Sequence, residues 1–123
     1  MDCPKIFESE YRFCRILWEN EPVNSTRLVE LCRERLGWSK ATTYTVIRRL
    51  SERGVVRNEN ATVTALISRE EAENNRVREM VEDTFQGSFP AFIAAFSRSR
   101  RLSKAEVDQL QELIDSYQED PNE

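Results

Sequence analysis

The chain has 123 residues, of which 39% are hydrophobic and 33% are charged. This length accommodates one domain of ordinary size, or one small domain with an appendage that completes its core with a partner. The composition is typical of a folded, helix-rich protein and excludes a disordered one. No stretch approaches the ~20 consecutive apolar residues of a membrane span, and residues 1–5 lack a secretory pattern. We therefore expect a cytoplasmic protein without membrane insertion.

The side chains that most catalytic and metal sites use are missing. The sequence contains no histidine and no Cys-x-x-Cys pair, which excludes the usual zinc sites. Histidine is also the commonest general base, and no glycine-rich phosphate loop takes its place, so we expect neither an enzyme nor a cofactor. Cys3, Cys14 and Cys32 are expected to be reduced structural thiols.

Charge is unevenly distributed along the chain. The net charge is −4, but residues 1–68 hold 11 Lys and Arg against 9 Asp and Glu, while residues 69–123 hold 7 against 13. Lysine and arginine supply the phosphate contacts of nucleic-acid-binding proteins. Only the first part therefore suits DNA, and we expect two units, residues 1–68 and residues 69–123.

Three helices are predicted in the first unit. Apolar residues at helical spacing predict a helix over residues 8–20. A second helix is capped by Asn24 or Ser25 and ends at Gly37, whose lack of a side chain permits a left-handed end. Ser39 then caps a third helix.

A β-hairpin is predicted to follow the third helix. Beyond Gly54, residues 55–57 and 62–67 are rich in β-branched side chains, and they flank a polar tip at residues 58–61. Three helices followed by a hairpin is the order of a winged helix. We therefore expect a mainly α fold with a small β-hairpin, formed by an N-terminal winged helix-turn-helix and a C-terminal helical dimerisation domain.

The second unit is predicted to be helical and incomplete by itself. Capping boxes at Ser68 and Ser103 start helices, the first running to about Phe85, and residues 118–123 are expected to fray. The unit has only about 55 residues, close to the size at which a lone core becomes marginal. Its apolar stripes are therefore expected to meet those of a second copy. The expected dimer interface comprises Phe89, Phe92, Phe96, Val107, Leu110, Ile114 and Tyr117.

The third helix carries the candidate DNA contacts. Its expected core stripe consists of Thr43, Val46, Ile47 and Leu50. In helix-turn-helix proteins the N-terminal part of the second helix meets base edges in the major groove. Thr42 and Thr45 offer contacts to bases, Arg48 offers a contact to guanine, and Lys40 and Arg49 can hold phosphates. The full predicted interface is Ser39, Lys40, Thr42, Tyr44, Thr45, Arg48 and Arg49. A solvated helix face has similar residues, so a winged-helix protein-interaction module without specific DNA binding is the alternative.

In identity and in order along the chain, the residues named below resemble those of the penicillinase and methicillin-resistance repressors and their copper-responsive relatives. The resemblance is carried by Glu10–Tyr11, Arg15–Glu19, Pro22, Trp38–Ser39, Thr42, Tyr44–Ile47, Arg49–Leu50, Gly54, residues 85–89 and residues 102–114. It implies a homodimer that binds an inverted-repeat, double-stranded operator and represses transcription.

The resemblance also implies a mode of control. In resistance-type members a membrane sensor protease system triggers cleavage near a Gly-Ser-Phe segment, which here places the cleavage site at Ser88 and Phe89. Three departures accompany the resemblance: Ser88 stands where cleaved members often have asparagine, Lys40 is displaced by one residue, and the hairpin lacks the usual arginine and tyrosines. The cysteine pairs of the copper-responsive branch are absent, so no copper site is expected.

Overall fold

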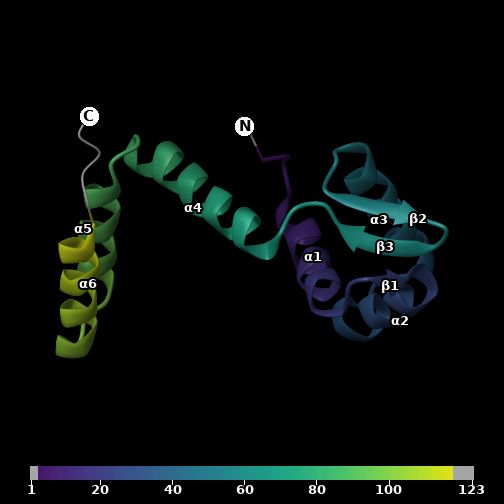
Figure 1. Ribbon diagram of the computed structural model, residues 1–123, viewed down its shortest axis with the longest axis horizontal. Helices are drawn as coiled ribbons and strands as arrows, with labels where there is room; N and C mark the ends of the chain where they lie inside the picture. Colours follow the sequence, from purple (N-terminus) through teal and green to yellow (C-terminus); the bar gives the residue numbers. More distant parts are fainter. Residues whose placement is uncertain (1–2, 118–123) are drawn as a thin grey trace. The chain divides into compact units, whose positions relative to one another are not determined.

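The computed structural model describes residues 3–117, which form six helices and one three-stranded antiparallel sheet (Figure 1). This confirms the predicted class, a winged helix with additional helices. The contacts divide the chain between Glu79 and Met80 into two compact units. The expected fraying of residues 118–123 lies outside the described residues.

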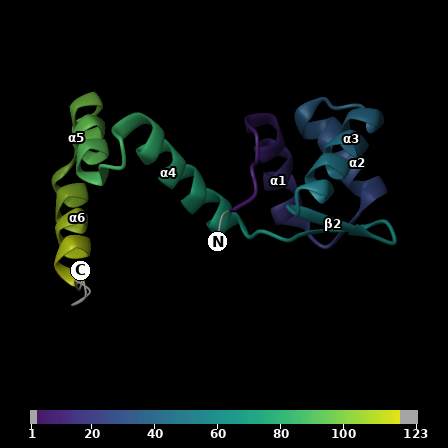
Figure 2. The ribbon, with the colours of Figure 1, turned by 90° about the horizontal axis from the view of Figure 1, so that it is seen from above.

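Three helices and the sheet form the N-terminal unit. Their bounds are α1 Glu8–Asn20, α2 Ser25–Leu36, α3 Lys40–Glu52, β1 Val23–Asn24, β2 Val56–Glu59 and β3 Thr62–Ala65. The three helices lie together on one side of the strands (Figure 2). Between the two layers, Phe13, Leu17, Leu28, Leu50 and Val63 are excluded from solvent. Burial of these large apolar side chains is the main stabilising contribution to the unit.

Helix ends follow the polar and glycine residues of the sequence. Asn24, rather than Ser25, caps α2, because its side chain accepts a 2.8 Å hydrogen bond from the Thr26 amide. The Ser39 side chain caps α3. Gly37 has φ 70° and ends α2 in the left-handed conformation that glycine adopts without a steric penalty.

The sheet contains one strand that the sequence did not predict, and its hairpin is tighter than expected. The strand order is β1-β3-β2, with Val23 of β1 opposite Val63 of β3. β1 has only two residues, too few to show an alternating pattern. At the hairpin, Glu59 pairs with Thr62, so only Asn60 and Ala61 form the turn, both with positive φ. The polar tip is therefore half the expected length.

The cysteines are free thiols within a mostly apolar environment. Cys14 and Cys32 are buried and Cys3 is half-buried. Burial raises the pKa of Cys14 to about 12 and that of Cys32 to about 11. A thiol with such a pKa stays protonated at neutral pH, which makes it a poor nucleophile. The structure therefore agrees with their expected role as packing residues.

A buried ion pair joins the first and third helices. Glu10 is 5% exposed, and its carboxylate pairs with the Arg53 guanidinium at the end of α3. The other Glu10 oxygen accepts a 2.9 Å hydrogen bond from the Phe7 amide, and Arg53 donates 2.7 Å to the Lys5 carbonyl. One pair thus connects the N-terminal segment, α1 and α3.

We predict that Glu10→Ala lowers the free energy of unfolding by about 3 kcal/mol, because Arg53 would be left partly buried without its counter-charge. Urea unfolding followed by circular dichroism measures this. The control is Glu19→Ala, which removes an exposed pair with Arg35 and should cost less than about 1 kcal/mol. Equal losses for the two variants would contradict the assignment.

The remaining helices are α4 Arg69–Phe85, α5 Phe89–Ser99 and α6 Lys104–Ser116. Ser88 and Ser103 cap α5 and α6, and Ser103 forms the predicted capping box with Glu106. The first turns of α4 belong to the N-terminal unit, where Ala72 joins the core. Among residues 3–117, no helix combines the length and the hydropathy that crossing a bilayer requires.

Candidate DNA interface and dimer surface

Helix α3 divides into a buried stripe and a free face. Thr43, Val46, Ile47 and Leu50 are all buried, as the spacing predicted. Of the residues expected to contact DNA, Ser39, Lys40, Thr42, Arg48 and Arg49 are exposed, and Tyr44 and Thr45 are half-buried. The structure therefore places the predicted set on α3 and its N-cap, with Tyr44 also packed against the core.

Three of these residues, Ser39, Thr42 and Tyr44, have hydrogen-bond partners within the protein. The Ser39 hydroxyl accepts a 3.1 Å bond from the Thr42 amide and donates 3.0 Å to the Thr42 hydroxyl. The Tyr44 hydroxyl donates 3.2 Å to the hydroxyl of Ser25, at the start of α2. Ser39 therefore fixes the beginning of α3, and Tyr44 helps to hold α3 against α2.

The cations of α3 have unsatisfied charge. Within residues 3–117, Lys40, Arg48 and Arg49 form no ion pair, whereas Arg53 pairs with Glu10. An exposed, unpaired guanidinium can bind a phosphate or a guanine edge without first breaking an internal bond. Arg49 in particular has no acidic partner in α3, although Glu52 lies on the same helix.

A hollow beside the start of α3 contains a cation that the sequence did not single out. The hollow has a volume of about 190 Å³ and is lined by Thr26, Val29, Glu30, Arg33, Lys40 and Tyr44. Arg33 belongs to α2, is exposed, and forms no ion pair among the described residues. Its place beside Lys40 follows from how α2 packs on α3, which the helical pattern of α2 does not reveal.

The hairpin supplies little positive charge. Its exposed face is lined by Arg57, Glu59, Asn60, Thr62 and Thr64. One arginine and one glutamate nearly cancel, so a wing built from them attracts phosphates weakly. The structure therefore concentrates the capacity for anion binding on α3 and the adjacent part of α2.

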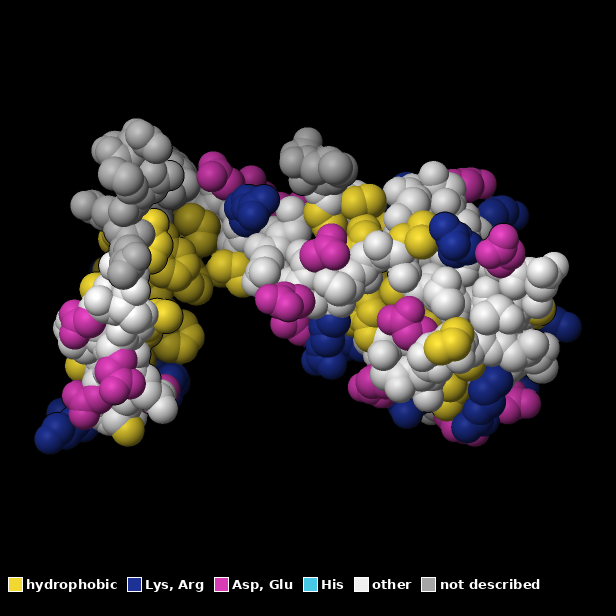
Figure 3. All heavy atoms as spheres, in the orientation of Figure 1, with side chains coloured by type: hydrophobic (Ala, Val, Ile, Leu, Met, Phe, Trp, Pro, Cys, Tyr) yellow, Lys and Arg dark blue, Asp and Glu magenta, His cyan; other side chains and the backbone are white. Residues whose placement is uncertain are grey.

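The C-terminal unit exposes much of its apolar surface. No residue of α5 or α6 is buried. Of the predicted dimer residues, Phe92 and Leu110 are half-buried. The exposed ones are Phe89, Phe96, Val107, Ile114 and Tyr117, from 44% to 70%. Leu113, which is 67% exposed, belongs to the same surface and was missed, although it lies three residues after Leu110. Figure 3 shows hydrophobic side chains gathered at the surface of this unit.

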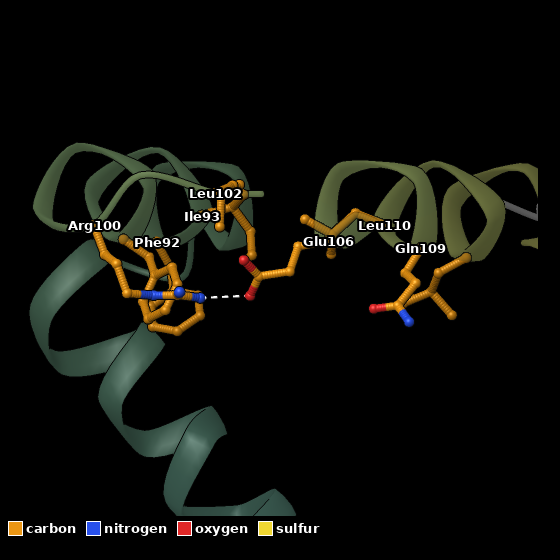
Figure 4. Close-up of a pocket in the computed structure, with 9 residues that line it drawn as sticks. Phe92, Ile93, Arg100, Leu102, Glu106, Gln109 and Leu110 are labelled. Carbon is orange, nitrogen blue, oxygen red and sulfur yellow. Dashed lines mark hydrogen bonds and ion pairs between the residues drawn. The ribbon is translucent and has the colours of Figure 1, made fainter. Parts of the chain in front are cut away.

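Between α5 and α6 runs an apolar groove of about 410 Å³. It is lined by Phe92, Ile93, Phe96, Arg100, Leu102, Glu106, Gln109, Leu110 and Leu113. Arg100 and Glu106 form a 2.6 Å ion pair there (Figure 4), and this bond, together with hydrogen bonds from Ser103, lowers the pKa of Glu106 to about 2. The two charges of this pair compensate each other, and apart from Gln109 the rest of the lining is apolar.

The segment expected to be cleaved is the turn between α4 and α5. Gln86 and Gly87 both have positive φ, and Ser88 caps α5 by accepting a 3.2 Å bond from the Ala91 amide. Phe89 is the first residue of α5 and is 54% exposed. The Ser88–Phe89 bond thus lies at the border between a turn and a helix.

Comparison with known protein families agrees with this arrangement. The family model for penicillinase repressors matches residues 6–116, and so covers both units. The chain belongs to this family. Penicillinase repressors are DNA-binding regulators of transcription. The chain therefore belongs to the general class of transcriptional repressors.

Two relatives have sequences similar to nearly the whole chain. One is an uncharacterized 16.5 kDa protein of Latilactobacillus sakei, 29% identical over 114 residues, which cover 89% of this chain and 78% of the relative. Another is the methicillin resistance regulatory protein MecI of Staphylococcus aureus strain Mu50, 20% identical over 114 residues, covering 89% and 93%. Both similarities extend beyond the winged helix into the C-terminal helices.

We predict that Tyr44→Phe lowers the free energy of unfolding by about 1 kcal/mol, because the buried Ser25 hydroxyl loses its partner on α3. Thermal melts measure the loss. Tyr117→Phe provides the comparison, since it makes the same change on a side chain that is 70% exposed and should change stability less. A Tyr44→Phe variant as stable as the parent would show that this bond does not hold α3 in place.

Proposed function

We propose that the protein represses transcription as a homodimer that binds an inverted-repeat operator, with one α3 helix in each half-site. The observation that carries this proposal is the free face of α3, where Lys40, Arg48 and Arg49 are exposed and form no ion pair among the described residues. Thr42 and Thr45 lie on the same helix, within reach of base edges if α3 enters the major groove.

The apolar surface of the C-terminal unit supports dimerisation. Leu113, Ile114 and Tyr117 are each more than 60% exposed. Large contiguous apolar surfaces are uncommon on monomers and mark interaction sites. A second copy offers the same surface, and a twofold axis makes such a surface self-complementary. Two α3 helices related by that axis would read the two halves of an inverted repeat.

The proposal extends to control by proteolysis. Cleavage between Ser88 and Phe89 would separate α5 and α6, which carry the apolar surface, from the DNA-binding unit. A repressor without its dimer contacts would lose the second half-site and most of its operator affinity. A membrane sensor protease system is the partner that this control requires.

The discriminating experiment is an anisotropy titration of the protein with the duplex upstream of its own gene and with a scrambled duplex. The proposed function requires a complex that prefers the upstream duplex and weakens with salt. A winged-helix protein-interaction module would bind neither duplex, even at low salt. That result would refute the proposed function.

We predict that the double variant Thr45→Ala, Arg48→Ala loses about 2–6 kcal/mol of affinity at each half-site of the operator while keeping its melting temperature. Each lost base contact is worth about 1–3 kcal/mol. Titrations against operator and scrambled duplexes, with circular dichroism melts, measure both quantities. Arg49→Ala is the contrast, because loss of a phosphate contact should weaken both duplexes and lower the salt slope. Unchanged operator affinity in the folded double variant would exclude this face of α3.

We predict that Leu110→Asp with Ile114→Asp produces a monomer, because two carboxylates buried without partners would cost more than about 3 kcal/mol of association free energy. Light scattering gives the mass. The matched control is Ala105→Asp with Ser116→Asp, which adds the same charge at two exposed positions of α6 and should remain dimeric. A dimer of the first variant would place the interface elsewhere.

A further inference from the structure

Helix α4 is attached to the N-terminal unit by contacts that begin before its first residue. The Trp18 indole donates a 2.9 Å hydrogen bond to the Ile67 carbonyl, two residues before α4 starts. One turn into the helix, Ala72 is 2% exposed and belongs to the core. These two contacts hold the beginning of α4 but act close to one point along it.

Arg76 makes the contact farther along the helix. It lies four residues after Ala72, which is one turn or about 6 Å along the axis. Its guanidinium stands 4.3 Å from the centre of the Tyr11 ring and forms a 2.9 Å ion pair with Glu8. Both partners belong to α1, which packs against α2 and the sheet. Arg76 therefore binds α4 to the DNA-binding unit at a second point.

The Tyr11 ring is itself held in place. It is 4% exposed and packs edge-on against Trp18, with ring centres 5.5 Å apart. A planar guanidinium over a fixed aromatic ring has a defined position, whereas a flexible ammonium would satisfy only the charge of Glu8. The geometry thus resists a swing of α4 about its beginning.

We infer that Arg76 is a positioning residue that sets the spacing between half-sites which the repressor accepts. This inference rests on the proposed function. If α3 binds DNA and the C-terminal helices hold the dimer, α4 is the segment that connects the DNA-binding unit to the dimerisation helices. Arg76 anchors the first turns of α4 to α1. The angle at which α4 leaves the winged helix then limits where each α3 can lie on the duplex.

Spacing is a sensitive readout because DNA is helical. Inserting two base pairs between half-sites rotates one relative to the other by about 70° and moves it by about 7 Å. A dimer whose α4 helices are firmly anchored follows this displacement only at a large loss of affinity. A dimer whose α4 can swing follows it at a smaller loss of affinity.

The test uses the full-length protein and three duplexes derived from a site that the wild-type protein selects from a random pool. They contain one half-site, both half-sites at the selected spacing, and both with two base pairs inserted. We expect the wild-type protein to prefer the selected spacing by at least about tenfold, which is the order of affinity that one mismatched base pair costs. Arg76→Ala should reduce this preference to less than about threefold and leave single half-site affinity unchanged.

Arg78→Ala is the matched control. Arg78 carries the same charge on the same helix, is exposed, and forms no ion pair among the described residues. This variant should keep the full spacing preference. Arg76→Lys, which keeps a charge near Glu8 but lacks the planar guanidinium over the Tyr11 ring, should fall between Arg76→Ala and the wild type.

The outcomes separate the two proposals. An Arg76→Ala protein that stays dimeric and discriminates spacing as well as Arg78→Ala overturns the role of Arg76 alone. A wild-type protein that binds one half-site as tightly as two overturns the proposed function, and this inference with it. If Arg76→Ala unfolds, Arg76→Lys and Glu8→Gln decide, and full spacing preference in both contradicts the inference.

Discussion

Helix α3 has to satisfy two demands with thirteen residues, and the rest of the N-terminal unit depends on how it does so. One stripe must be buried, because Val46, Ile47 and Leu50 complete the core between α1, α2 and the hairpin. The proposed function requires the opposite face to stay free and charged. The buried stripe also contains one polar residue, Thr43, whose hydroxyl is satisfied because it donates to the Ser39 carbonyl at 3.0 Å.

Placement of this helix rests on polar contacts as much as on apolar packing. The Glu10–Arg53 pair fixes the end of α3 against α1, and Tyr44 contacts Ser25 near its beginning. Apolar packing alone tolerates small rotations, since it has no strong directional preference. Hydrogen bonds and ion pairs depend on direction and distance, and they therefore define the rotation of α3 that presents Arg48 and Arg49 outward.

The C-terminal unit differs from the N-terminal unit in that its helices α5 and α6 are capped but not buried. Its helices are well capped, by Ser88 and Ser103, yet none of the residues of α5 and α6 is buried. Capping stabilises a helix locally, whereas a unit of this size gains most of its stability from burying an apolar face. An uncovered face between capped helices is consistent with a unit whose core is completed by another chain. The excess of negative charge lies in residues 69–123, whereas residues 1–68 are slightly positive. This explains how a chain with a net charge of −4 can belong to a family of DNA-binding proteins.

The sequence by itself determined the helical character of both units, the caps at Ser39 and Ser103, the hairpin and the family resemblance, because these follow from local periodicity and from residues such as Ser39 and Gly37 that have few structural uses. Only the tertiary structure decided the features that join distant residues. β1 is too short to have a pattern and exists because Val23 meets Val63. Arg33 reaches the start of α3, and Arg76 reaches Tyr11 and Glu8, through the packing of one helix on another. Periodicity shows which face of a helix is buried, but not which helix covers it, and that difference separates the residues that were predicted from those that were not.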